Sequence, residues 1–539
     1  MRKTALLAAL GTMAVLGEPR AAAAQDIEAL ARARGITLPS AYYERVARDP
    51  DFFELRGGWR NRPAASLAGA EGVIAASYLP RYGNLRMAVV MTLFAGSAPP
   101  PFSTEITHQQ LFGQNPLGSL TDFYREISGG RVTLTGTVLP WTRTGVTLAE
   151  AAGASIGLGE DAKIGEYVMS ALQGVDANVN FGQFDNDGPD GVPNSADDDG
   201  YVDVTVFQYS EVAGSCGGPG PWPHRGSVTG WTGQPYTSDD RRPNGEPVRV
   251  DEYIMQSAVD CDGGPQPISI IAHETGHAFG LPDFYDASAG ILPADRRWVL
   301  GCWTLMAAGS WGCGDGAAIT KVERPPHMGA YEKGQLGWID EHEARVDGSA
   351  RYTLPPVQTS GQSLRIPLPG GAEYLLLEYR PNTGFDGGLP VGGVLMYHVD
   401  ISLPVRPCAT CPKRYRVRLV EADGDGALIR QAREGGNRGE PGDVFTGTRV
   451  LTDESTPSLR LNSGAASNLV LTITVEAGQA QVQVVRRPQL TFNQVMSPYL
   501  GGVALSANEQ AAVDALGNAN GRFDLGDVRA FLRTSPAAE

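Results

Sequence analysis

Two histidines four residues apart, with a glutamate beside the first, form the clearest chemical pattern in the chain. His273, Glu274 and His277 lie in the stretch IAHETGHAFGLPDFYD, which covers residues 271–286. Residues four apart share one face of an α-helix, so both imidazoles can bind one metal ion. Zinc favours such ligands and keeps a position for water, which Glu274 could deprotonate as a general base. A solvated helix face that carries polar residues is the alternative.

The residues after His277 extend this pattern. Pro267 can open a helix, Gly280 can adopt the left-handed conformation that ends it, and the returning chain would let Asp283 supply a third zinc ligand. Farther along, Met306 lies in the Gly- and Ala-rich stretch GCWTLMAAGSWG. Taken alone, such a methionine is ordinary core; together with the extended helix motif, it predicts the methionine turn beneath a metzincin zinc site.

An acidic loop precedes a short apolar strand. Its aspartates alternate with Gly, Pro and Asn, and calcium prefers six to eight oxygen ligands on a backbone that can curl. We expect a calcium site in residues 185–203, although a solvated acidic loop would have the same composition. The expected ligands are Asp185, Asp187, Asp197, Asp199 and Asp203.

A second acidic segment lies near the C-terminus, in DALGNANGRFDLGDVRAFL. It resembles half of a dockerin-type calcium unit, in which a calcium loop runs into a helix. Its candidate calcium ligands are Asn518, Asn520, Asp524 and Asp527. The first loop position is Leu516, which cannot bind a metal, so a loop without calcium is an equal alternative. A cohesin-type partner is the weaker expectation, because a dockerin has two such segments.

Apolar periodicity predicts the elements that position these residues. Residues 87–94 predict a buried strand, 120–141 a helix followed by a strand after Gly-Gly, and 161–175 a second helix. The acidic loop runs into a strand at 202–207. Alternating segments in 350–486 predict a β-rich region.

The two ends and the length suggest several units. Arg2, Lys3, an apolar stretch and Ala22-Ala23-Ala24 are typical of a signal peptide, and no later segment is predicted to insert stably in a membrane. We therefore expect export from the cell. The predicted divisions are a signal peptide at 1–24, a possible propeptide at 25–85, a catalytic domain at 86–345, a β-rich domain at 346–486 and a helical, dockerin-like segment at 487–539.

Charge and cysteine content restrict the partners and the compartment. The 539 residues carry a net charge of −16, which argues against nucleic acid as a partner. Six cysteines in an exported chain predict disulfides. The expected pairs are Cys216 with Cys261, Cys302 with Cys313, and Cys408 with Cys411, the last as a local bridge in preference to a redox or metal site.

Several of these stretches together resemble the immune inhibitor A family of secreted metallopeptidases in the metzincin clan. The matching pieces are SLTDFYREISGGRVTLTGTV, PWPHRG, HETGHAFGLPDFYD, WTLMAAGSW, EKGQLGW and GGVLMYHVD. The resemblance implies an α+β zinc peptidase domain, a propeptide, structural calcium and protein or peptide substrates. It makes His273, His277 and Asp283 zinc ligands, Glu274 the general base and Met306 the turn residue.

Two other functions are alternatives. One is a non-catalytic, calcium-dependent surface or adhesion protein on a peptidase scaffold, which predicts loss of Glu274 or of a zinc ligand, whereas all of these residues are present. The other is a zinc hydrolase of a non-peptide amide, with which the motif agrees. An additional transition-state donor is expected in many such sites. The candidates are His224, Tyr285 and His327, and for each a structural role is the simpler interpretation.

Overall fold

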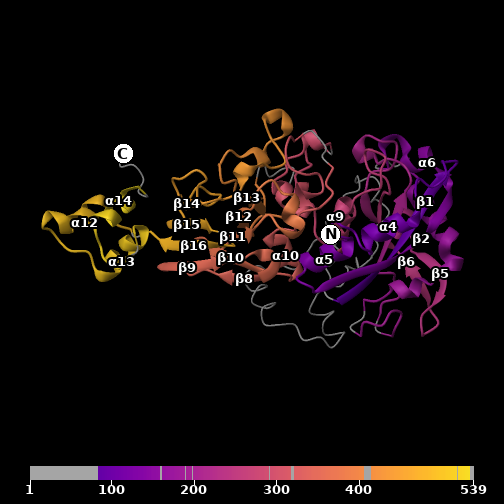
Figure 1. Ribbon diagram of the computed structural model, residues 1–539, viewed down its shortest axis with the longest axis horizontal. Helices are drawn as coiled ribbons and strands as arrows, with labels where there is room; N and C mark the ends of the chain where they lie inside the picture. The colour runs from indigo at the N-terminus through magenta and orange to yellow at the C-terminus, as the bar shows by residue number, and fades with distance from the viewer. Residues whose placement is uncertain are drawn as a thin grey trace, which may run out of the picture.

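The computed structural model describes residues 83–157, 161–187, 190–196, 198–290, 292–316, 321–405, 414–476, 478–487, 489–518 and 520–533. The predicted signal peptide, all but the last three residues of the predicted propeptide, Asp197, Cys408 and Cys411 lie outside these ranges. The described part is elongated, with the N-terminal elements at one end and three C-terminal helices at the other (Figure 1).

A five-stranded sheet organises the N-terminal half. Four of its strands are parallel, and the edge strand β4 runs antiparallel to β7. In spatial order the strands are β2 (Val132–Thr147), β1 (Gly83–Ala95), β3 (Val204–Tyr209), β7 (Glu252–Ser257) and β4 (His224–Ser227). A separate two-stranded ribbon pairs β5 (Tyr236–Arg241) with β6 (Pro247–Val250).

Helices cover both faces of this sheet because β1 alternates between two apolar cores. Met87 and Val89 face a core that includes helices α5 (Leu120–Ile127) and α9 (Ile268–Ala278). Ala88 and Val90 face the opposite core, which includes helix α7 (Ile164–Val175). A strand buried on both sides appears in sequence as a continuous apolar run. Helix α9, which carries the histidines, is thereby held against the sheet.

Two further sheets follow in the C-terminal half and pack face to face over one core. The first contains β13 (Val417–Leu419), β12 (Gly393–Asp400), β11 (Glu373–Arg380), β10 (Gln362–Pro367) and β8 (Asp340–Glu343). The second contains β14 (Thr448–Leu451), β15 (Leu469–Glu476), β16 (Gln479–Arg486) and β9 (Ser349–Leu354). The β-rich region expected from the sequence is therefore a two-sheet sandwich in the structure.

The first of these sheets also belongs to the core of the N-terminal half. Leu375 and Leu377 of β11 face the sandwich core, whereas Tyr374 and Leu376 face the core that surrounds α9. Helix α10 (Ala330–Leu336) and Trp338 lie in the same shared core. Peptidase-side and sandwich-side elements thus bury one continuous apolar region between them.

The remaining helices are short and lie at the periphery. They are α4 (Thr104–Leu111), α6 (Leu148–Ala152), α8 (Val228–Thr232), α11 (Val357–Ser360), α12 (Phe492–Met496), α13 (Ala507–Leu516) and α14 (Leu525–Arg533). The last three share a small core of their own. None of the described helices has both the length and the apolar content to cross a bilayer.

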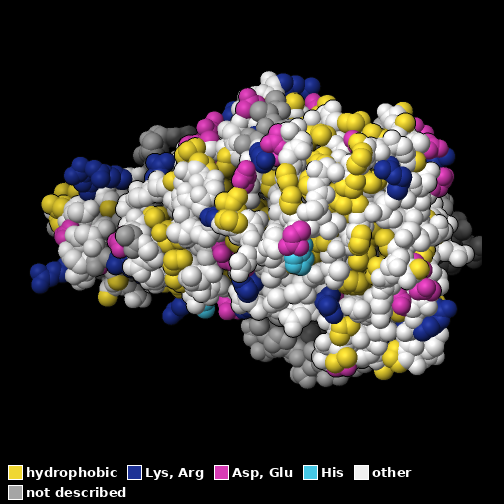
Figure 2. Space-filling view, turned by 45° about the vertical axis from the view of Figure 1, so that its right-hand side comes forward, with side chains coloured by type: hydrophobic (Ala, Val, Ile, Leu, Met, Phe, Trp, Pro, Cys, Tyr) yellow, Lys and Arg dark blue, Asp and Glu magenta, His cyan; other side chains and the backbone are white. Residues whose placement is uncertain are grey.

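The expected mixture of helices and strands is present. Each element predicted between residues 87 and 207 exists, with bounds that differ by a few residues. The helix predicted after Pro267 begins at Ile268. On the face shown in Figure 2, acidic and basic side chains of the described residues are interspersed, with hydrophobic groups between them.

Candidate metal centre

Helix α9 carries both histidines, His273 and His277, and packs in the shared core. Ile268 and Ile271 anchor it to the apolar interior, and the Tyr124 hydroxyl donates a hydrogen bond of 2.7 Å to the Ala272 carbonyl. The helix ends before Gly280, whose φ of +97° is the left-handed conformation expected from the sequence. The chain can therefore turn back beneath the helix within a few residues.

Each imidazole is oriented by a backbone carbonyl. Nδ1 of His273 lies 2.9 Å from the Leu305 oxygen, and Nδ1 of His277 lies 2.7 Å from the Leu281 oxygen. A carbonyl oxygen only accepts hydrogen bonds, so each Nδ1 carries the hydrogen and each Nε2 can offer a lone pair. Both residues are buried. The two Nε2 atoms are thus the ring atoms that can bind a metal ion.

The turn after the helix brings the Asp283 carboxylate to these atoms. Asp283 Oδ1 lies 3.1 Å from His273 Nε2 and 3.5 Å from His277 Nε2. One ligand atom from each of the three residues lies within 4.8 Å of the others. Tetrahedral zinc with bonds of about 2.0–2.2 Å spaces its ligands by roughly 3.4 Å. Two imidazoles and one carboxylate at these separations therefore fit a zinc ion.

The charges in this cluster depend strongly on one another. Burial lowers the pKa of His273, but the hydrogen bond and the charge of Asp283 outweigh burial and raise it to about 9. Burial alone would raise the pKa of Asp283; His277 and His273 instead bring it well below its ordinary value. Burial raises the pKa of Glu274, and the two histidines offset this only in part. Because metal binding requires an Nε2 lone pair, a bound cation would take the place of a proton on His273.

The predicted methionine turn lies against the metal-binding helix. Residues Leu305–Gly309 form a tight, irregular turn in which Ala307 leaves helical geometry. A Cβ on Gly276 of α9 would collide with the Met306 sulfur, so this glycine permits the close approach of helix and turn. The Met306 carbonyl also accepts a hydrogen bond of 2.8 Å from the Phe284 amide. Helix, turn and the loop of Asp283 are therefore one connected unit.

An arginine that the sequence analysis did not single out ties the edge strand to this unit. Arg225 of β4 donates a hydrogen bond of 3.0 Å to the His277 carbonyl and forms an ion pair of 2.9 Å with Glu252 of β7. Both charged side chains are almost fully buried. The stretch PWPHRG contains this arginine, but its role depends on a contact across 52 residues. Spacing along the sequence carries no signal for such a contact.

The three candidate donors have different surroundings. Tyr285 lies two residues after Asp283 and interacts with it electrostatically. The centre of its ring lies 4.3 Å from the guanidinium carbon of Arg296. His224 bonds the Trp222 carbonyl at 2.7 Å through Nδ1 and approaches the Tyr253 hydroxyl at 3.2 Å.

His327 is fully buried, between Glu126 at 2.8 Å and Lys333 at 2.9 Å. It therefore belongs to a structural network, whereas Tyr285 interacts electrostatically with the predicted zinc ligand Asp283.

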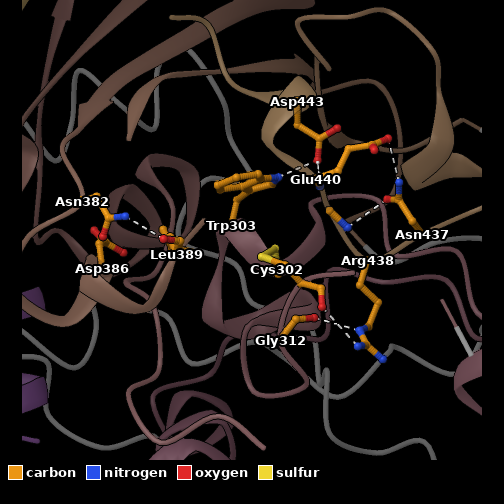
Figure 3. The surroundings of a disulfide bond; sticks show 12 residues. Cys302, Trp303, Gly312, Asn382, Asp386, Leu389, Asn437, Arg438, Glu440 and Asp443 are labelled. Atoms are coloured by element: carbon orange, nitrogen blue, oxygen red, sulfur yellow. Dashed lines mark hydrogen bonds between the residues drawn. A yellow bond between two sulfur atoms is a disulfide. The ribbon is translucent and has the colours of Figure 1, made fainter. Parts of the chain in front are cut away.

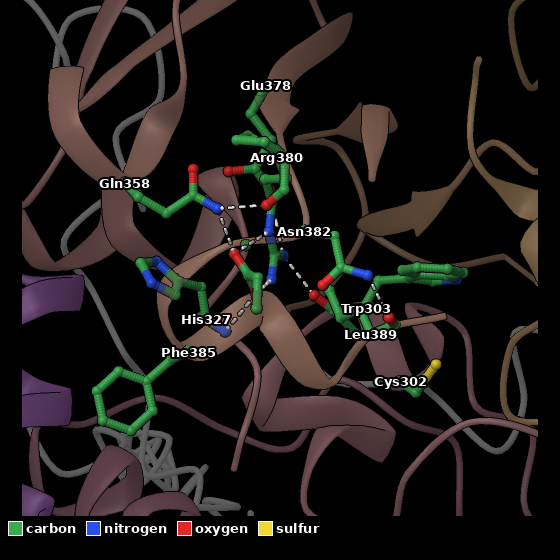
Figure 4. Close-up of polar contacts among 12 residues, drawn as sticks. Cys302, Trp303, His327, Gln358, Glu378, Arg380, Asn382, Phe385 and Leu389 are labelled. Carbon is green, nitrogen blue, oxygen red and sulfur yellow. Dashed lines mark hydrogen bonds and ion pairs between the residues drawn. The ribbon is translucent and has the colours of Figure 1, made fainter. Parts of the chain in front are cut away.

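That structural network supports the turn from the opposite side. Arg380 of β11 donates a hydrogen bond to the Trp303 carbonyl and pairs with Asp386. Figure 4 shows Arg380 among His327, Gln358 and Trp303. The backbone amide of His327 donates to Asp386, and its carbonyl accepts from Leu305. The segment that leads into the methionine turn is thus held by the sandwich sheet.

The acidic loop brings together part of the predicted calcium set. Ligand atoms of Asp185, Asp187 and Asp203 lie within 4.8 Å of one another. Both carboxylate oxygens of Asp185, one of Asp203 and the side-chain oxygens of Asn186 and Asn194 are buried without a hydrogen-bond partner. Burial, followed by the charges of neighbouring aspartates, raises the pKa of Asp185 to about 8.

Asp199 contacts this group through its backbone amide, which donates to Asp187 at 3.3 Å. Asn186 and Asn194 were not predicted, although asparagines beside aspartates are frequent calcium ligands.

The C-terminal candidate has its polar groups paired with one another. Asp524 accepts hydrogen bonds of 3.2 Å from both Asn518 and Asn520. Asp527 accepts hydrogen bonds from the backbone amides of Asn518 and Asp524.

Two of the expected disulfides are present, Cys216–Cys261 and Cys302–Cys313.

Known proteins are similar to the part of the chain that contains this centre. Residues 102–339 match the family described as immune inhibitor A peptidase M6, catalytic domain. The Pre-pro-metalloprotease PrtV of Vibrio cholerae serotype O1 (strain M66-2) is 27% identical over 205 residues, or 36% of this chain and 21% of that protein. Immune inhibitor A of Bacillus thuringiensis subsp. alesti is 26% identical over 303 residues, or 50% of this chain and 42% of that protein.

The chain therefore spans between a fifth and two fifths of the length of these relatives. The matched range includes the helix, the loop of Asp283, the methionine turn and α10. Residues 102–339 are thus similar to the catalytic domain of immune inhibitor A-type M6 peptidases.

Proposed function

We propose that the chain is a secreted zinc-dependent endopeptidase that hydrolyses peptide bonds of extracellular proteins. The observation that carries this proposal is the convergence of His273, His277 and Asp283, with each imidazole oriented by its own carbonyl. The similarity to M6 peptidases and to two relatives named as a metalloprotease and as immune inhibitor A supports it. When bound, zinc supplies Lewis-acid activation of a water molecule and of the scissile carbonyl.

The protein's own residues would perform the proton transfers. Glu274 lies one residue from a predicted ligand, is buried, and is influenced most by His277 and His273 after burial itself. In the proposed mechanism it accepts the proton of the attacking water and returns it to the leaving amine. In the same proposal Tyr285, whose hydroxyl interacts electrostatically with Asp283, would donate a hydrogen bond to the developing oxyanion.

A metzincin-type site is the finer form of this proposal. The left-handed Gly280, the carboxylate of Asp283 and the close contact of Gly276 with Met306 support it. Export is supported by the two disulfides, which form in oxidising compartments, and by the predicted signal peptide.

Calcium in the acidic loop is a further part of the proposal. Five buried oxygens without hydrogen-bond partners, on Asp185, Asn186, Asn194 and Asp203, support a cation there. Buried polar atoms ordinarily find a partner, and oxygens that share a hard cation satisfy this requirement. The role expected for this ion is structural, since the loop leads directly into strand β3.

The decisive experiment compares the wild-type chain with Glu274→Ala on casein and gelatin, with and without a zinc chelator. We expect cleavage by the wild type alone, lost on chelation and restored by zinc. Mass spectrometry of the products should show new peptide termini. Glu476→Ala, which changes an exposed glutamate on β15, is the matched control and should cleave normally.

Zinc content distinguishes the alternatives. If Glu274→Ala binds zinc but the wild type cleaves no protein, the site is a non-catalytic scaffold or acts on a non-peptide amide. Asp283→Ala should lower the zinc content itself, because it removes one of three ligands. Equal cleavage by wild type and Glu274→Ala would refute the proposed mechanism.

A further inference from the structure

Three carboxylates in the sandwich half form a second oxygen-rich cluster, far from the histidines in sequence. Ligand atoms of Glu421, Asp423 and Asp443 lie within 4.8 Å of one another. Two backbone hydrogen bonds of 3.0 Å join the segments that carry them, from Ala422 to Asp443 and from Asp423 to Gly442. A Cβ on Gly442 would strike the Asp423 carboxylate. The backbone is therefore shaped to let these carboxylates approach.

The buried member of this cluster has an oxygen without a partner. Asp443 is fully buried, and its Oδ2 accepts hydrogen bonds from the Trp303 indole at 2.7 Å and the Glu440 amide at 3.0 Å. Its Oδ1 has no hydrogen-bond partner. Figure 3 shows that this second oxygen points away from Trp303. A fully buried carboxylate oxygen without a partner is costly unless a cation or a proton satisfies it.

The three carboxylates repel one another, and the cation Arg418 acts on Glu421. Burial, then the charge of Asp443, raises the pKa of Glu421 to about 7. Burial also raises the pKa of Asp443 to about 6, with Asp423 contributing. Both Glu421 oxygens accept backbone hydrogen bonds, from Ala427 and Leu428. These bonds fix the orientation of the carboxylate without neutralising it.

We propose that Glu421, Asp423 and Asp443 bind a calcium ion that links the sandwich to the methionine-turn segment. Three carboxylates and a Gly-containing loop with left-handed Gly424 and Gly426 match the preference of calcium for oxygen ligands on a curled backbone. The ion would fix Asp443, whose other oxygen holds Trp303. Trp303 lies three residues before Met306, and its carbonyl is held by Arg380.

Terbium, a luminescent substitute for calcium, gives a local readout because Trp303 contacts one of the ligands. The full-length chain with Glu274→Ala is used, so that self-cleavage cannot occur. We expect excitation of tryptophan to produce terbium emission that calcium abolishes. Asp423→Asn should lower the affinity for calcium about tenfold or more, since one charged ligand is lost. Trp303→Phe should reduce the emission while bound calcium is retained.

Matched variants separate this site from the acidic loop. Asp425→Asn changes an exposed neighbour whose carboxylate pairs with Arg430 at 2.7 Å, and it should bind calcium normally. Asp185→Asn should retain the emission that depends on Trp303. Elemental analysis should find one calcium fewer per chain in Glu421→Gln than in the Asp425→Asn control.

Equal calcium content in Asp423→Asn, Glu421→Gln and the control would overturn the proposal. Preferential binding of magnesium at equal concentration would overturn the assignment to calcium. Because Asp423 is exposed, its substitution does not disturb the core, and circular dichroism verifies the fold of each variant. The readouts are metal content and emission, so they remain informative even if the chain cleaves no protein.

Discussion

Individual residues at the candidate metal centre are held by groups that lie far away in the sequence. The Leu305 carbonyl orients His273, and Arg225 binds the His277 carbonyl. The proposed ligands therefore depend on a backbone carbonyl of the turn and on an arginine side chain of the edge strand. Second-shell contacts of this kind commonly change metal affinity by about 10- to 100-fold when they are lost.

Replacing Arg225 tests this dependence. Arg225→Leu leaves the Glu252 carboxylate buried without its 2.9 Å ion-pair partner. We expect the free energy of unfolding to fall by about 3–5 kcal/mol, measured by chemical denaturation. The control is Arg125→Leu, which removes an exposed pair with Asp122 and should cost less than about 1 kcal/mol. Similar small losses in both variants would contradict the structural role of Arg225.

At the scale of elements, helix α9 and the methionine turn are packed with no space for an additional methyl group. Gly276→Ala should raise helix propensity by about 1 kcal/mol, yet we expect a net loss of about 1–3 kcal/mol because the new Cβ meets Met306. Thermal unfolding of Gly276→Ala, Met306→Ala and the double variant measures this coupling. The double variant should be more stable than the sum of the single effects predicts; strict additivity would show that the two residues do not interact.

In the absence of calcium, the ion proposed for it, the acidic loop should make the free energy of unfolding depend on pH. The pKa of Asp185 is about 8 in the folded chain, against an ordinary value of 3.8. A group with a raised pKa stabilises the fold fully below its unfolded pKa, and that stabilisation is lost as the pH rises through the folded value. The free energy of unfolding without calcium should thus decrease between about pH 4 and pH 8.

Denaturation over this pH range, with and without calcium, provides the measurement. Calcium should add most to the free energy of unfolding near pH 8. At this pH the carboxylates of the loop become charged, and a bound calcium ion would neutralise them. Asp185→Asn should flatten the calcium-free profile. If the calcium-free pH profile of Asp185→Asn equals that of the wild type, the acidic loop is not the source of the pH dependence.

At the scale of the whole molecule, the peptidase-like half and the sandwich share a core. Tyr374 and Leu376 of β11 pack with elements of the metal-binding half, whereas the C-terminal helices have a core of their own. We expect a chain truncated after residue 487 to keep its melting temperature and metal content. A chain truncated after residue 345 should expose the shared core and aggregate or unfold.

Limited proteolysis and calorimetry of the two truncations distinguish these outcomes. The C-terminal helices touch the sandwich through few groups, among them Gln483, which bonds the Ala515 carbonyl at 3.0 Å. An independently stable fragment ending at residue 345 would show that the shared core is not required.

The sequence predicts the local parts of this molecule well and the long-range parts poorly. Helix periodicity, Pro267 and Gly280 predict α9 and its end because these signals act within a few residues. The roles of Arg225 and Arg380 could not be predicted, since each depends on which strand lies beside which turn. The boundary expected at residues 345 and 346 follows a change in composition and carries no information about the shared core.

Arg380 has a consequence for genetic studies of this chain. It lies more than one hundred residues after His273 in the sequence, on a strand outside the matched M6 range, and still holds the segment that leads into the turn beside the candidate metal site. Inactivating substitutions should therefore map to two widely separated stretches of the gene. For the same reason, a chimaera that takes its sandwich from a homologue should also need the homologue's methionine turn, because the contacts between the two depend on both sequences.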